Sequence, residues 1–167
     1  AFFKIDNHIS LNYHPITMLS LAFNYNQSGL ENTFGWYFTN ILFHVLNTLL
    51  VFVFIMKLTD NNKIVALITA AGFGLHPMHV ESVAWISERK DVLYVFFFML
   101  SCISHVNYRK SGKYIWMFYS FLLFLLSCLS KAMAVPLPIA LLLIDWYLLK
   151  RITIKQILEK IPFLIIA

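Results

Sequence analysis

The chain contains few charged side chains. Asp, Glu, Lys and Arg make up only 13% of its 167 residues, whereas a soluble globular domain carries about 25%. Hydrophobic residues make up 60%, above the usual share of about 45–50%. This composition excludes an ordinary soluble domain and predicts an integral membrane protein.

Glycine and proline are also scarce, with five of each, while phenylalanine alone contributes sixteen residues. A transmembrane barrel needs many turns and strands of alternating polarity, and the chain lacks both patterns. We therefore expect an all-α fold, a polytopic bundle of about five to six transmembrane helices.

Cysteine occurs only twice, at Cys102 and Cys128, each inside an apolar run. This placement predicts two small buried hydrophobes and neither a disulfide nor a metal pair. The net charge of +5 does not indicate a nucleic-acid partner, because the basic residues lie in short loops between apolar runs, where they set membrane orientation.

The apolar runs divide the chain into two parts. Residues 1–35 read as an outer loop with an interfacial helix at residues 15–24, since Pro15 suits a first helical turn. Residues 36–167 read as a transmembrane helical bundle. Its expected spans are 38–56, 64–75, 92–106, 114–129, 132–149 and a partial one at 157–167. The chain opens without an initiator Met and ends in an apolar run, so we expect a piece of a longer membrane protein.

Orientation follows from the basic residues, which are unevenly shared between the two membrane faces. One face receives Lys57, Lys63, Arg109, Lys110, Lys113, Lys150, Arg151, Lys155 and Lys160. The other receives only Lys4, Arg89, Lys90 and Lys131. By the positive-inside bias the first face is cytoplasmic, which places residues 1–35, 76–91 and 130–131 together on the outer face.

The most polar segment lies between two apolar runs and reads HPMHVESVAWISERKD, from His76 to Asp91. His76, His79 and Glu81 have the residue types of a metal site. Their spacing differs from that of the helical zinc-protease motif, and contacts with a substrate or a structural pairing are the alternatives. We therefore predict no resident cofactor and leave a divalent metal as the open alternative.

Four consecutive charges, Glu88 to Asp91, close this segment. They fit a solvated loop in which Asp91 caps the following span. They also fit an anion site in which Arg89 and Lys90 bind a phosphate. Lys131 runs against the orientation bias and stands between two apolar runs. It either reaches the headgroups or joins Arg89 and Lys90 at the same phosphate.

Two further polar patterns accompany these charges. Residues 12–17, NYHPIT, include His14 and form an aromatic and polar patch suited to contacts with a sugar or to loop anchoring. Asn40, His44 and Asn47 recur at spacings of four and three, so they share one face of a helix. We expect that face to point into the bundle and to form hydrogen bonds between helices.

The sequence resembles the membrane half of the transmembrane and tetratricopeptide-repeat proteins, particularly bacterial members. The resemblance rests on four blocks that occur in this order: NYHPIT, TN with His44, HPMHVESVAWISERKDVL and SKAMAV. The resemblance implies a GT-C-type glycosyltransferase with a polyprenyl-phosphate-linked sugar donor. It also implies an acceptor, for which a protein hydroxyl is one candidate, and a site on the periplasmic face of a bacterial inner membrane. Membrane lipid and the donor are then the expected partners.

The resemblance further implies an acidic pair upstream of the NYHPIT patch, where this chain offers only Asp6. We therefore expect the catalytic base to lie upstream of residue 1, with Asp6 and Asp91 as weak local substitutes, and this piece alone is not expected to be active. The expected substrate-binding residues are His14, His76, His79, Glu81, Glu88, Arg89, Lys90 and Lys131. A non-catalytic membrane scaffold that carries repeats is the alternative function. A transporter is a third and weaker alternative, because the ionisable residues of a transporter lie at mid-membrane, whereas those of this chain gather at one face.

Overall fold

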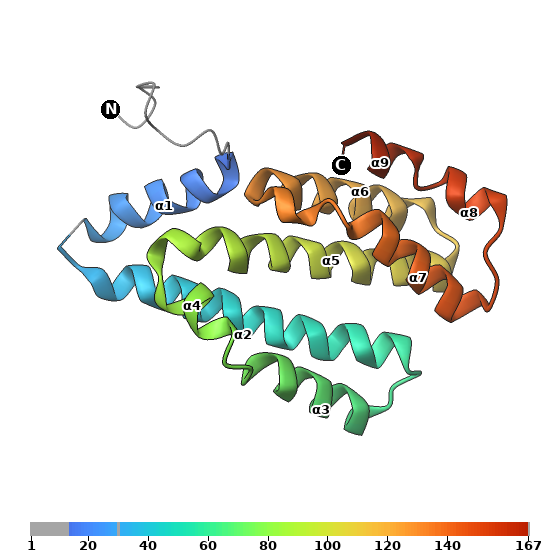
Figure 1. Ribbon diagram of the computed structural model, residues 1–167, viewed down its shortest axis with the longest axis horizontal. Helices are drawn as coiled ribbons and strands as arrows, with labels where there is room; N and C mark the ends of the chain where they lie inside the picture. The colour runs from blue at the N-terminus through green and yellow to red at the C-terminus, as the bar shows by residue number, and fades with distance from the viewer. Residues whose placement is uncertain (1–13, 30, 167) are drawn as a thin grey trace.

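The fold is all-α throughout the part of the chain that the computed structural model describes, residues 14–29 and 31–166 (Figure 1). Its elements are α1 Pro15–Ser28, α2 Thr33–Leu58, α3 Lys63–Gly74, α4 His79–Ala84, the 3-10 turn η1 Ile86–Glu88, α5 Arg89–Ser111, α6 Tyr114–Ser130, η2 Ala132–Ala134, α7 Leu137–Leu149, α8 Ile154–Leu158 and α9 Ile161–Ile166. The predicted fold class is confirmed. The predicted helix at residues 15–24 is α1, with Pro15 in its first turn.

Three helical segments are long and apolar enough to cross a membrane: Thr33–Leu58, Ile86–Ser111 and Ala132–Leu149. α3 and α6 are apolar but shorter. In Figure 1 the long elements form a row, α3 beside α2, α2 beside α5 and α5 beside α6, and each of these neighbouring pairs is in contact. The chain is therefore a multi-pass helical membrane protein.

α2 is the longest helix, and its 26 residues extend about 39 Å, enough for a hydrocarbon core of about 30 Å. A tight turn reverses the chain, with positive φ at Asp60 and Asn61. α3 then begins where the Asn62 side chain accepts a hydrogen bond from Val65 N. A Cβ atom on Gly74 would lie 2.9 Å from the Thr48 side chain, so glycine permits the close approach of α3 to α2.

The run expected at 64–75 forms only a 12-residue helix, about 18 Å long and shorter than a bilayer core. α3 ends at Gly74, before His76-Pro77, as the proline predicts. The chain then continues along α2 as the six-residue α4. α3 and α4 are therefore two parts of one interrupted helical path beside α2.

α5 and α6 form the central hairpin, reversed at Gly112 in the left-handed conformation, φ 69°. Ser101 Oγ donates to Ser120 O at 2.7 Å and Ser120 Oγ to Ser101 O at 3.0 Å. Small hydroxyl residues of this kind let apolar helices approach closely. The buried core next to this hairpin contains Cys102, Val106, Phe124, Ala134, Leu137, Leu141, Ile144 and Phe163.

The span expected at 132–149 is a candidate membrane span, within which η2 precedes α7 and Pro136 stands as the N-cap of α7. The run 157–167 is not one helix in its described part, because α8 ends at Leu158 and α9 begins at Ile161. The expected interior placement of cysteine is confirmed: Cys102 is buried, Cys128 is half-buried, and both are free.

Candidate functional site

Polar contacts gather at both ends of the bundle. At one end Lys57 Nζ donates to Asn107 Oδ1 at 2.8 Å, and Lys110 pairs with Asp60 at 3.1 Å. The loops after α2 and α5 therefore lie together, as the count of basic residues predicts. The opposite end carries most of the predicted site residues: His14, Glu88, Arg89, Lys90, Asp91 and Lys131. We call this second end the basic end.

Arg89 is the central side chain of the basic end, and it is fully buried. Its Nε donates to Asn40 Oδ1 at 2.9 Å, one terminal nitrogen to Trp36 O at 2.8 Å, and the other to Asn24 Oδ1 and, at 3.4 Å, to Ser20 O. This guanidinium ties α1, α2 and α5 together. All these acceptors are neutral, so its charge is not cancelled by a carboxylate among its hydrogen-bond partners. Direct contact with a phosphate is the predicted role of Arg89. Because its side chain is buried, Arg89 cannot make that contact in this conformation.

Lys131 is tied to the first turn of α5. Its ammonium forms an ion pair with Asp91 Oδ1, and Ser82 Oγ donates to Asp91 Oδ2 at 3.4 Å. Lys131 Nζ also lies 5.8 Å from the centre of the Tyr94 ring. One sequence interpretation had Asp91 capping this span, and that interpretation is wrong. α5 begins at Arg89, after the N-cap Glu88, so Asp91 lies inside the helix. Both carboxylate oxygens instead hold side chains of the site.

His14 joins the basic end through the start of α1. Thr17 Oγ1 donates to Ser130 O at 3.0 Å, which holds that start beside the end of α6 and next to Lys131. Burial, and then the charges of Lys90 and Lys131, lower the pKa of His14 below its ordinary value. Its Nδ1 atom is buried and has no hydrogen-bond partner in the described part of the chain. The site therefore pairs a neutral imidazole with two ammonium groups.

Lys90 and Glu88 form an ion pair at 3.2 Å, and both side chains are partly exposed, 27% and 21%. The structure thus brings His14, Lys90, Asp91 and Lys131 to one end, with the Glu88 carboxylate beside Lys90. Asp6, the other candidate acid, lies outside the described residues, as do Asn12 and Tyr13 of the NYHPIT patch.

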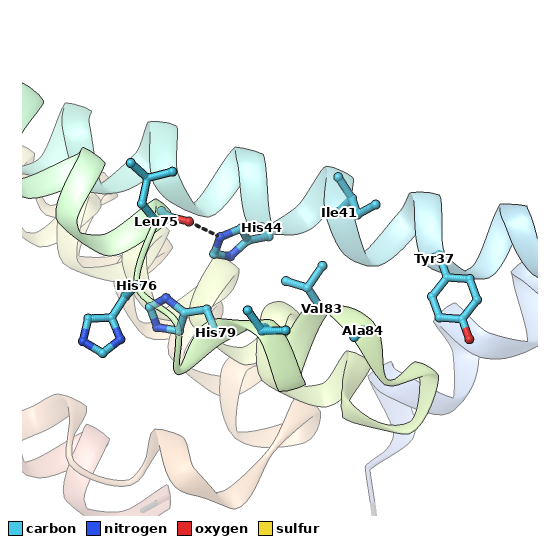
Figure 2. A pocket seen from close by; sticks show the side chains of 10 residues that line it. Tyr37, Ile41, His44, Leu75, His76, His79, Val83 and Ala84 are labelled. Atoms are coloured by element: carbon cyan, nitrogen blue, oxygen red, sulfur yellow. Dashed lines mark hydrogen bonds between the residues drawn. The ribbon is translucent and has the colours of Figure 1, made fainter.

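The other predicted residues form a separate group along α2. His79 Nδ1 bonds to Phe73 O at 2.7 Å, and its ring lies 5.5 Å from that of His44 and 5.8 Å from that of His76. These three rings border a cavity of about 450 Å³, together with Tyr37, Ile41, Gly74, Leu75, Val80, Val83 and Ala84 (Figure 2). Glu81 is exposed on α4. Within residues 14–29 and 31–166 no three His, Cys, Asp or Glu side chains are arranged to hold a metal.

The shared polar face of α2 points into the protein, as predicted. Asn40 Nδ2 donates to Val83 O and Trp85 O, and Asn47 Nδ2 donates to Val92 O at 2.9 Å. His44 Nε2 bonds to Gly74 O at 3.0 Å. Asn40 and His44 thus bond to carbonyls at the ends of α4 and α3, where the helical path is interrupted.

A buried ionic cluster at the far end of α5 escaped the sequence interpretation. The Asp145 carboxylate receives His105 Nε2 at 2.6 Å, Arg109 at 2.6 and 2.7 Å, and Lys160 Nζ at 2.9 Å. Arg109 also pairs with Glu159 at 2.6 Å. Asp145 and His105 stand inside predicted spans, and ionisable residues in such positions are a signal that could have found the cluster. It joins α5, α7 and the α8–α9 connection, twenty residues from Arg89, or about 30 Å along the helix.

The chain is similar to stretches of several protein O-mannosyl-transferases. It is 35% identical over 100 residues to Protein O-mannosyl-transferase TMTC1 of Mus musculus, covering 60% of this chain and 10% of that protein. It is 32% identical over 114 residues to Protein O-mannosyl-transferase TMTC4 of Homo sapiens, covering 60% of this chain and 15% of that protein. It is 30% identical over 154 residues to Protein O-mannosyl-transferase TMTC2 of Homo sapiens, covering 89% of this chain and 18% of that protein.

The chain thus spans less than a fifth of the length of these relatives. No family profile matches it, and no solved structure does. The resemblance expected from the sequence blocks is confirmed as a similarity to O-mannosyl-transferases.

Proposed function

We propose that this chain is part of a membrane glycosyltransferase that transfers a sugar from a polyprenyl-phosphate donor to a protein hydroxyl. Its relatives are protein O-mannosyl-transferases, which supports both the class of reaction and a protein acceptor. The structural observation that carries the proposal is the basic end. Here Lys90 and Lys131 come together with His14, whose buried Nδ1 has no hydrogen-bond partner among the described residues.

The charges of the basic end support an anionic donor. Arg89, Lys90 and Lys131 carry three positive charges, and Glu88 and Asp91 supply two negative ones. The uncancelled charge belongs to Arg89, which is buried among neutral acceptors and raises the local positive potential without touching a ligand. A lipid phosphate at Lys90 and Lys131 would balance this charge.

The reaction needs one phosphate-binding part and one proton acceptor. The bond between the anomeric carbon of the sugar and the phosphate oxygen breaks, and a bond from that carbon to the acceptor oxygen forms. Polyprenyl phosphate leaves with the bonding electron pair, and Lys90 and Lys131 stabilise its charge. The hydroxyl proton passes to a carboxylate base.

Asp91 is the described candidate for that base, but Lys131 and Ser82 already occupy its two oxygens. We therefore assign Asp91 the task of orienting Lys131 and leave Asp6 as the candidate base. By the positive-inside bias the basic end faces outward, which in a bacterium is the periplasm.

Turnover by the full-length protein in vesicles tests the proposal. With radiolabelled polyprenyl-phosphate mannose and a serine- and threonine-rich peptide, we expect transfer of label to the peptide. Lys131→Ala should lower the rate about 100-fold, the usual effect of removing one group that stabilises a developing charge. Lys113→Ala, an exposed lysine at the other end of the bundle, should leave the rate unchanged. Absence of transfer from every polyprenyl-phosphate sugar tested would contradict the proposal.

A further inference from the structure

The cavity between α2 and α4 adjoins the basic end, because His44 and His79 also line a smaller cavity with Asp91. The walls of the larger cavity are mostly apolar, and several wall residues are strongly exposed: Tyr37 41%, Ile41 49%, Val80 64% and Leu75 84%. Figure 2 shows the side chains of Ile41 and Val83 directed toward each other across it, with His44 and His79 at one end and Tyr37 at the other. We call this cavity the α2–α4 groove.

The groove runs along the first part of α2. α2 is a candidate membrane span, and its first residue is Thr33. Counting along the helix, Tyr37 lies about 6 Å and His44 about 17 Å from that start. The groove therefore extends from near the start of the span toward its middle, and Tyr37 and Ile41 on its wall are exposed.

The histidines close the inner end of the groove and are held rigidly. A backbone carbonyl only accepts, so His44 Nε2 donates to Gly74 O and His79 Nδ1 donates to Phe73 O. These two N–H groups are therefore used inside the protein. The bonded rings form a fixed floor at this end of the groove.

Two features disfavour a partner helix as the occupant of this groove. One wall is α4, whose six residues extend only about 9 Å. Helix pairs in membranes also pack through small residues, whereas Ile41, Leu75 and Val80 border this groove. A volume of about 450 Å³ lies in the range of small-molecule sites, about 300–1,000 Å³.

We propose that the α2–α4 groove binds one hydrocarbon chain of a bilayer phospholipid. The chain enters sideways from the membrane between α2 and α4, and its end rests against the imidazoles of His44 and His79. The lipid headgroup then lies near Tyr37, at the level of the aromatic belt. This site is independent of the proposed sugar transfer.

Photolabelling of the full-length protein in nanodiscs tests this site. The probe is phosphatidylcholine with a diazirine near the end of one acyl chain, diluted in unlabelled phosphatidylcholine, and labelled residues are read by mass spectrometry. We expect labelling of His79 and Val80 to exceed that of Leu67 and Ile68 at least fivefold. The last two are exposed side chains of α3, 63% and 67%, outside the groove.

A matched pair of variants sharpens the test. Val80→Trp fills the groove and should lower labelling of His79 at least threefold, whereas Ile68→Trp, a similar change on α3, should not alter it. Equal labelling of the groove and α3 in the unmodified protein would overturn the site, since it would show only bulk lipid. The wild-type map decides the matter even if Val80→Trp does not fold.

Discussion

Asp91 and Lys131 form an ion pair across 40 residues of sequence, joining the first turn of α5 to the residue that follows α6. Each side chain is 23% exposed, so the pair is partly open to a ligand. In the proposed phosphate site, a phosphate that binds Lys131 would compete with the Asp91 carboxylate for the same ammonium. The pair would then set how tightly the site holds an anion.

Replacing Asp91 with Asn should strengthen phosphate binding. The change removes the competing charge while preserving the shape of the side chain, so we expect affinity for polyprenyl phosphate to rise several-fold. Thermophoresis of the full-length protein in detergent measures it. Asp60→Asn, which changes a carboxylate of an exposed pair at the other end, is the control. Unchanged or weaker binding in Asp91→Asn would show that the two groups do not compete.

Arg89→Lys should destabilise the protein by about 2–4 kcal/mol. A lysine cannot satisfy the fork of acceptors around the guanidinium, and each buried acceptor left without a partner costs about 1–3 kcal/mol. Thermal unfolding in detergent checks this. Lys110→Met, which breaks an exposed ion pair, should cost less than about 1 kcal/mol. Equal effects of the two changes would contradict a structural role for Arg89.

The environment of Arg89 also shows where sequence reasoning stops. The all-α membrane fold and the inward face of Asn40 and Asn47 were predictable, because an amide in an apolar span must find a partner inside the protein. Arg89 reads as an exposed charge in the sequence. Its acceptors on Asn24 and Trp36 stand 65 and 53 positions away, and a local pattern contains no record of such contacts.

The same limit applies to the C-terminal segments. Hydropathy alone predicts unbroken runs at 132–149 and 157–167. It does not register the turn between η2 and α7 or the turn between α8 and α9. It also left Lys160 among the loop lysines, whereas Lys160 is fully buried against Asp145.

Asp145→Asn should be among the most destabilising single changes. It leaves Arg109 and Lys160 without the carboxylate between them, and removing one partner of a buried ion pair costs about 3–5 kcal/mol. Unfolding in a denaturing detergent measures the loss. Protein that remains folded should bind polyprenyl phosphate as the wild type does, since the cluster lies about 30 Å from Arg89 along α5. Selective loss of binding by folded protein would contradict this separation.

His14 should make stability depend on pH. Its pKa in the folded protein lies below the ordinary value of 6.5, so above pH 6.5 the side chain is neutral in both states and contributes nothing. As pH falls below 6.5, the unfolded state takes up a proton that the folded state does not. Stability is therefore lost until the pH drops below the folded pKa.

Titration of labelled His14 by NMR checks this directly. Lys131→Met should raise the pKa of His14, because one of its two nearby ammonium charges is removed, but not to 6.5, because burial is the larger cause. The control Lys113→Met should leave the pKa of His14 in place. A His14 pKa at or above 6.5 in the wild type would show that His14 lies outside the basic end.

The central claim is that the basic end binds a lipid phosphate, and a comparison of two lipids tests it most directly. Binding of polyprenyl phosphate and of neutral polyprenol to the full-length protein isolates the contribution of the phosphate. We predict that the phosphate tightens binding at least tenfold in the wild type, and that Lys90→Met with Lys131→Met removes this difference. Equal affinity for the two lipids, or a phosphate preference that survives the double change, would contradict the assignment.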